Sequence, residues 1–185
     1  KGSEDTLYEA SMADAVIYAF NRTVAGFDRE ILDAFHEGQG MAASPINSQG
    51  ILTKVDMGGI WDIFSGKTPV EAAEAVTSSV MRNPEIKSLL FSIFPVCAKV
   101  MEGYGRLEEA DWKALSQIAK ADPEELLELL FDDRTFAACE EDVYMELGTT
   151  ASRTRLMELI GKYGILEIAG MLRKGAGRDE IGKTL

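Results

Sequence analysis

The chain has 185 residues, of which 46% are hydrophobic and 27% are charged. This composition is typical of a globular protein and excludes a disordered one, and the length suits one domain or one domain plus an appendage. The formal net charge of −12 argues against non-specific binding to nucleic acid or to an anionic membrane.

The first half of the chain predicts helices joined by one unusual loop. Hydrophobic residues at four-residue spacing predict a helix over residues 4–24, and a second helix follows over residues 28–37. The segment Gly38–Gly50 is glycine-rich and uncharged, but it has neither of the common glycine patterns for phosphate binding. Ile51–Val55 is the one credible short strand, and Thr68-Pro69 predicts the start of a helix over residues 69–82.

The most apolar stretch runs from Asn83 to Gly103, and we expect the other helices to pack around it. Asn83 can cap a helix, and Pro84 fits the first helical position. The apolar part is too short to cross a membrane, so the sequence predicts a buried central helix. Pro95 would kink this helix and free the carbonyl group of Phe91.

The second half of the chain predicts a succession of short, well-capped helices. They are expected over residues 107–121, 123–131, 133–147, 151–163, 165–173 and 178–185. The fold class predicted from the sequence is therefore all-α: a single compact domain of about eight to ten helices around a Pro-kinked central helix, with at most one short strand. Residues 1–150 are acidic and residues 151–185 are weakly basic, which predicts an acidic helical body and a short basic appendage packed on it.

No set of residues predicts catalysis. His36 is the only histidine, so a histidine-based metal cluster within one chain is excluded, and we expect no metal, no catalytic residue and no cofactor. The cysteines, Cys97 and Cys139, suit buried positions in a reducing compartment, and we expect a cytoplasmic protein without a membrane segment.

Three hypotheses for the function remain open. The leading one is a non-enzymatic module that binds another protein or itself, through an acidic helix face or through the apolar region 38–66 with Met41, Ile46, Ile51, Trp61 and Phe64. The second is a regulator whose C-terminal helix-turn-helix contacts nucleic acid through Arg173, Lys174, Arg178 and Lys183. The third is a small-molecule-binding protein or enzyme with a pocket between the Gly38–Gly50 loop and the kinked helix, lined by His36, Lys54 and Pro95.

Overall fold

The computed structural model describes residues 4–21, 26–38, 45–57, 60–138 and 147–185. The chain forms two compact units: unit 1 comprises Lys1–Trp61 and Pro69–Val96, and unit 2 comprises Asp62–Thr68 and Cys97–Leu185. The boundary that the charge distribution predicts after residue 150 lies inside unit 2, and it stays a prediction.

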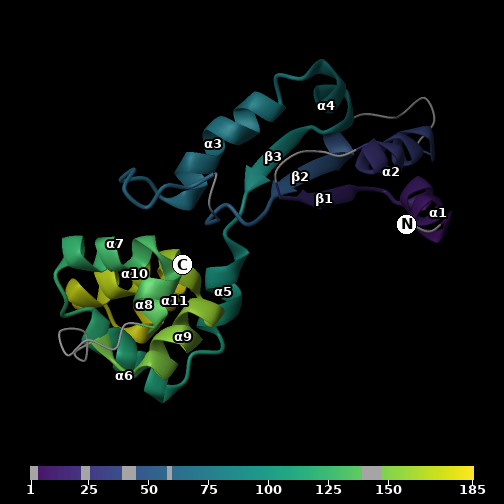
Figure 1. Cartoon of the computed structure of the whole chain (residues 1–185). Helices are drawn as coiled ribbons and strands as arrows, with labels where there is room; N and C mark the ends of the chain where they lie inside the picture. The colour runs from purple at the N-terminus through teal and green to yellow at the C-terminus, as the bar shows by residue number, and fades with distance from the viewer. Residues whose placement is uncertain (1–3, 22–25, 39–44, 58–59, 139–146) are drawn as a thin grey trace. The chain divides into compact units, whose positions relative to one another are not determined.

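Unit 1 contains a three-stranded parallel sheet in the order β1-β2-β3 (Figure 1). The strands are β1 (Val16–Phe20), β2 (Ser48–Leu52) and β3 (Ser92–Pro95). The helix α2 (Gly26–Gly38) joins β1 to β2, and α3 (Pro69–Val80) and α4 (Pro84–Leu89) lie between β2 and β3. This alternation of strands and helices shows that the all-α prediction is wrong for the whole chain: the fold is helix-rich with a small parallel sheet.

Two of the predicted helices contain strands instead. The helix predicted over residues 4–24 ends early, as α1 (Glu4–Met12), and β1 follows with the sequence VIYAF. β-Branched and aromatic residues favour a pleated strand. In VIYAF this preference outweighs the four-residue spacing of hydrophobic residues that predicted a helix.

The predicted central helix is also divided. Asn83 caps α4 by accepting a hydrogen bond from the backbone N–H of Glu85, and Pro84 starts the helix, as predicted. The helix ends at Leu89, however, and β3 and then α5 (Ala98–Tyr104) follow. Pro95 kinks no helix: it ends β3, an edge strand, where a missing N–H costs little.

The two faces of the sheet have different surroundings. On one face Phe20, Leu52 and Ile93 are buried. Gly50 lies on the same face and makes room for the side chain of Ile93, because a Cβ at position 50 would lie only 2.9 Å from Cγ1 of Ile93. On the other face Ile17 and Phe94 are 71% and 55% exposed. Parallel sheets are normally covered by helices on both faces, so an apolar face left this open is unusual.

The helices of unit 1 pack on one another and on the sheet. In the described part of the chain α1 packs against α2, α2 against α4, and α3 against β3. A short 3-10 helix, η2 (Pro45–Asn47), leads into β2 and packs against α4.

In its described residues, unit 2 has helices and no strand. Its other helices are α6 (Glu109–Ile118), α7 (Pro123–Phe131), α8 (Asp133–Ala138), α9 (Thr150–Leu159), α10 (Gly161–Arg173) and α11 (Arg178–Thr184). The central helix is α10, which packs against α5, α6, α7 and α9 and buries Ile165 and Ile168 completely. Gly103 allows α5 to approach α9 closely, because a Cβ at this position would overlap the carbonyl oxygen of Leu159.

The helix starts of unit 2 were the most predictable part of the fold. The carboxylate of Asp122 accepts hydrogen bonds from the N–H groups of Glu124 and Glu125, and the hydroxyl of Thr149 accepts one from Ser152. Both caps occur where Asp-Pro and Thr-Thr predicted them. The second half of the helix predicted over residues 133–147 lies mostly outside the described residues.

Among the described helices, none combines the length and the hydrophobicity that crossing a lipid bilayer requires.

Candidate functional site

The carboxyl ends of β1 and β2 are tied together by one residue. Thr53 follows β2 directly, and both its N–H and its hydroxyl donate hydrogen bonds to the carbonyl oxygen of Phe20 at the end of β1, at 2.7 and 3.1 Å. On the other side, the N–H of Val96 donates to the carbonyl oxygen of Leu52 at 2.8 Å. These bonds hold the chain that leaves β2 in a fixed position at the carboxyl edge of the sheet.

The next residue, Lys54, has an unusual backbone conformation. Its φ is +57°, and in the described ranges no other non-glycine residue has a positive φ. The left-handed conformation costs a non-glycine residue on the order of 1 kcal/mol or more, and such outliers cluster at functional sites. The turn is closed by a hydrogen bond from the N–H of Met57 to the carbonyl oxygen of Lys54, at 3.1 Å.

This turn presents two opposite charges around a buried anchor. Val55 is fully buried, whereas Lys54 is exposed and Asp56 is half-buried. Within the part of the chain that the structure describes, no hydrogen bond or ion pair engages the Lys54 ammonium or the Asp56 carboxylate. This strained turn with two unengaged charged groups lies at the carboxyl edge of a parallel sheet, which is the edge where open α/β sheets bind ligands, but the order β1-β2-β3 contains no reversal of strand order.

The structure brings together only some of the residues predicted to line a pocket. Lys54 and Pro95 both lie at the carboxyl edge, since Pro95 is in register with Leu52. His36 lies at the far end of α2, where its Nε2 donates to the carbonyl oxygen of Leu89 at the end of α4, 3.0 Å away. His36 therefore links two helices, and Asp56, which the sequence analysis did not select, is the acidic member of the site.

The residues predicted to bind a partner do not all belong to one unit. Trp61 is buried in unit 1, Ile46 is exposed on η2, and Met41 lies outside the described residues. Phe64 belongs to unit 2, where its ring packs against that of Phe131 with 5.4 Å between centroids.

Two of the four cations predicted to contact nucleic acid have partners inside unit 2. Arg173 donates from Nε and Nη2 to the carbonyl oxygens of Ala119 and Ala121, at 2.9 and 3.1 Å. Arg178 donates from both Nη atoms to the carboxylate of Glu109, at 2.7 and 2.8 Å. Lys174 and Lys183 are exposed. The nucleic-acid interface stays a prediction, with two of its four residues engaged in holding the fold.

Arg178 also attaches α11 to the rest of unit 2. Its guanidinium lies 5.0 Å from the centre of the Trp112 ring, and the hydroxyl of Tyr104 donates a hydrogen bond to its carbonyl oxygen. Hydrogen bonding to Arg178 holds the pKa of Glu109 below its ordinary value of 4.5.

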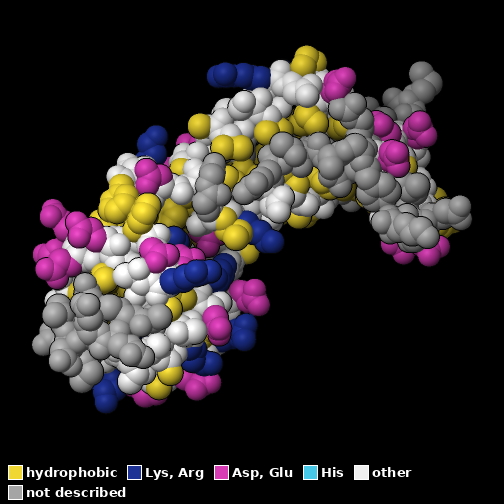
Figure 2. Space-filling model, viewed as in Figure 1, with side chains coloured by type: hydrophobic (Ala, Val, Ile, Leu, Met, Phe, Trp, Pro, Cys, Tyr) yellow, Lys and Arg dark blue, Asp and Glu magenta, His cyan; other side chains and the backbone are white. Residues whose placement is uncertain are grey.

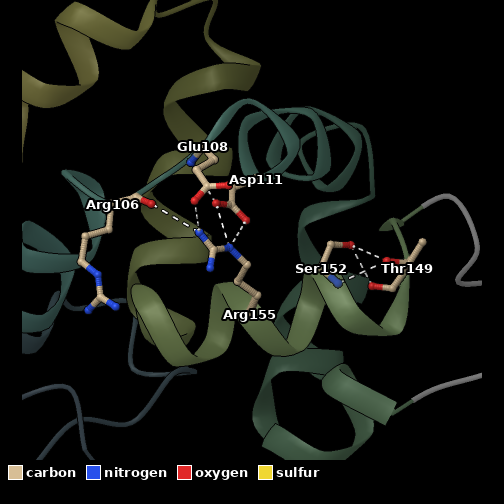
Figure 3. A network of polar contacts seen from close by, with 6 residues as sticks. All are labelled: Arg106, Glu108, Asp111, Thr149, Ser152 and Arg155. Atoms are coloured by element: carbon tan, nitrogen blue, oxygen red, sulfur yellow. Dashed lines mark hydrogen bonds and ion pairs between the residues drawn. The ribbon is translucent and has the colours of Figure 1, made fainter.

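A second cluster of charges, around Asp111, has a structural role (Figure 3). The carboxylate of Asp111 is buried in the first turn of α6 and accepts from the N–H of Glu108 at 2.9 Å. Nε of Arg155, on α9, donates to both carboxylate oxygens at 2.9 and 3.1 Å, and its Nη2 lies 3.2 Å from the carboxylate of Glu108. The hydrogen bond to Asp111 raises the pKa of Arg155 further above its ordinary value. Because every group in the cluster is paired, it fastens α6 to α9.

The described residues contain no group of three or more His, Cys, Asp or Glu side chains that could hold a metal ion. Comparison with protein-family models, curated proteins and solved structures gave no match to this chain. The chemistry of the site therefore rests on its own residues.

Proposed function

We propose that unit 1 binds a nucleotide through its base, at the Lys54–Asp56 turn. The observation that carries the proposal is the left-handed backbone of Lys54 beside a half-buried, unengaged Asp56 carboxylate. A protein that maintains about 1–3 kcal/mol of backbone strain does so where the strain positions functional groups.

The chemistry of the two side chains selects a class of base. An ionised carboxylate only accepts hydrogen bonds, and its two oxygens suit two adjacent N–H donors. Guanine presents such a pair, its ring N–H and its exocyclic amino group, whereas the corresponding edge of adenine places an acceptor nitrogen beside its amino group. The long apolar stem of Lys54 can cover the flat face of a base while its ammonium stays in water. A guanine base is therefore the best match.

The test is binding of nucleotides to the full chain by isothermal titration calorimetry. We expect binding of guanosine diphosphate and no measurable binding of adenosine diphosphate. Asp56→Asn is expected to weaken guanosine diphosphate binding at least tenfold, because a hydrogen bond to a charged group contributes about 1.5–3 kcal/mol. The same substitution should improve binding of xanthosine diphosphate, whose exocyclic oxygen accepts from the new amide.

Two further variants make the test specific. Asp14→Asn changes an exposed carboxylate of unit 1 away from the turn and should leave binding unchanged. Lys54→Gly removes the side chain but keeps the left-handed backbone accessible, and it should weaken binding without loss of folding. Equal binding of all nucleotides, no binding at millimolar concentration, or an Asp56→Asn variant that keeps the original preference would each refute the proposal.

A further inference from the structure

Unit 2 exposes a pair of aromatic rings that come from distant parts of the sequence. The rings of Phe64 and Phe131 pack 5.4 Å apart at an interplanar angle of 37°, and the two residues remain 53% and 63% exposed. The backbone of Phe64 is held by a hydrogen bond from its N–H to the carboxylate of Asp62 at 3.0 Å. Phe131 is the last residue of α7. We call these two residues the Phe64–Phe131 patch.

The patch lies beside a helix face that is entirely acidic. Helix α7 buries Leu126, Leu129 and Leu130. Its charged residues, Glu124, Glu125 and Glu128, are all exposed, and α7 contains no Lys or Arg. Glu128 precedes Phe131 by three positions, which places the two side chains next to each other on the helix surface. Figure 2 shows Asp and Glu side chains gathered over the region where Figure 1 labels α7.

The acidic character continues beyond the end of the helix. Asp132 follows Phe131, and hydrogen bonds from the hydroxyl and N–H of Thr135 hold the pKa of this carboxyl below its ordinary value, so it stays ionised. Lys162 lies close by, where it donates to the carbonyl oxygen of Phe131 at 3.4 Å and is paired with Asp133 at 2.8 Å. Among the described residues, Lys67 and Arg134 are also cations close in sequence to the patch. The carboxylates of Asp62, Glu128 and Asp132, together with Glu124 and Glu125, outnumber Lys67 and Arg134 and leave the surroundings of the patch net negative.

We propose that the Phe64–Phe131 patch binds an amphipathic helix of a partner protein, apolar on one face and bordered by Lys or Arg. Exposed aromatic rings in contact are typical anchors of protein interfaces, and a helix laid on an apolar surface is a common recognition mode. The acidic border of the patch complements a basic border on the partner. This site lies on unit 2 and is independent of the nucleotide site proposed on unit 1.

The same charge pattern disfavours two other occupants. In a symmetric dimer the patch would face its own copy, and the acidic faces of both α7 helices would repel each other. An anionic membrane would be repelled in the same way.

The test uses a fluorescein-labelled synthetic helix of Leu on one face and Lys at the borders, titrated with the full chain by fluorescence anisotropy. A matched peptide carries Glu in place of every Lys. We expect the Lys peptide to bind at least tenfold more tightly than the Glu peptide, with an affinity that falls as salt is raised. Phe64→Ser and Phe131→Ser should each weaken binding of the Lys peptide at least tenfold.

Matched variants separate the patch from the rest of the surface. Phe91→Ser removes a phenylalanine that is 55% exposed in unit 1 and should leave binding unchanged. Glu128→Lys should weaken binding of the Lys peptide, whereas Glu74→Lys, on an exposed position of α3, should not. Circular dichroism checks that each variant is folded, which we expect because all these side chains are exposed.

Three results would overturn the proposal. Unchanged binding by Phe64→Ser and Phe131→Ser would show that the rings are not anchors. Equal binding of the Glu peptide would show that the acidic border selects nothing. A dimer in analytical ultracentrifugation that Phe131→Ser converts to a monomer would identify a second copy of the chain as the occupant.

Discussion

Unit 1 and unit 2 differ in how completely their side chains are packed and their buried polar groups are hydrogen-bonded. In unit 2 the central helix α10 contacts four other helices, and the buried Asp111 and Arg153 both have hydrogen-bond partners. In unit 1 one face of the sheet is open, Lys54 is strained, and the buried hydroxyl of Ser48 has no partner among the described residues. The comparison teaches that the less satisfied unit is the better candidate for ligand binding, because unsatisfied and strained groups accumulate at sites of function.

The chain offers a separate optical reporter for each unit. Trp61 lies in unit 1 and Trp112 in unit 2, both are buried, and the sequence contains no other tryptophan. Variants that keep one tryptophan, Trp112→Phe or Trp61→Phe, report the unfolding of unit 1 or unit 2 by fluorescence.

The largest expected effect tests the close packing of unit 2. Gly103→Ala places a Cβ against the carbonyl oxygen of Leu159, and we expect it to lower the free energy of unfolding of unit 2 by about 3 kcal/mol. The measurement is urea denaturation followed by Trp112 fluorescence. Gly170→Ala is the control: it lies in the helix α10 with open space around it, and it should stabilise the unit by about 0.5–1 kcal/mol. An equal response to both substitutions would contradict the close approach of α5 and α9.

The second prediction tests the two faces of the sheet in unit 1. Leu52→Ala removes a fully buried side chain and should cost about 3 kcal/mol, measured by urea denaturation with Trp61 fluorescence. Phe94→Ala, on the open face, should cost about 1 kcal/mol or less because its ring is already 55% exposed. A cost for Phe94→Ala as large as that for Leu52→Ala would mean that the open face is covered in solution.

The sequence predicted unit 2 much better than unit 1, for physical reasons. Helix starts depend on one or two residues close in sequence, so Asp122-Pro123 and Thr149 were sufficient to locate two of them in unit 2. A parallel sheet depends on pairing between distant segments, and the strands β1 and β3 are only five and four residues long. Such short apolar runs fit a buried helix as well as a strand, and for β3 its own Pro95 favoured the interpretation as a kinked helix.

Part of the candidate site was also accessible from the sequence. Lys54 was selected because it follows the glycine-rich loop, and the strand predicted at Ile51–Val55 overlaps the end of β2. Asp56 was missed because its significance depends on the two neighbouring strands, which were read as helices. The strained backbone of Lys54 leaves no signal in the sequence at all.

A third prediction concerns the buried hydroxyl of Ser48. Its oxygen lies in β2 without a hydrogen-bond partner in the described structure, and burial of an unpaired hydroxyl is unfavourable. Ser48→Ala should therefore raise the free energy of unfolding of unit 1 by about 1 kcal/mol, measured as above. A loss of stability of similar size would indicate that the hydroxyl is satisfied in solution. Ser78→Ala, on an exposed position of α3, is the control and should change little.

The smallest expected effect is a pH dependence in unit 2. Because Arg178 lowers the pKa of Glu109 in the folded state, this pair stabilises the fold above the ordinary value of 4.5. The contribution is lost as the pH falls from that value through the lowered pKa. Glu109→Gln should reduce the loss of stability between neutral and acidic pH, whereas Glu74→Gln should leave the pH profile as it is. Identical profiles for the wild-type protein and Glu109→Gln would refute the role of the pair.

The contacts of α11 also have a consequence for biosynthesis. Arg178 binds Glu109, which is 69 residues earlier in the sequence, and the hydroxyl of Tyr104 reaches the same residue across 74 positions. At a typical synthesis rate of about 5–20 residues per second, Glu109 and Trp112 leave the ribosome several seconds before the arginine that covers them. Unit 2 can therefore complete these contacts only after α11 has left the ribosome, and until then the ring of Trp112 lacks its contact with Arg178.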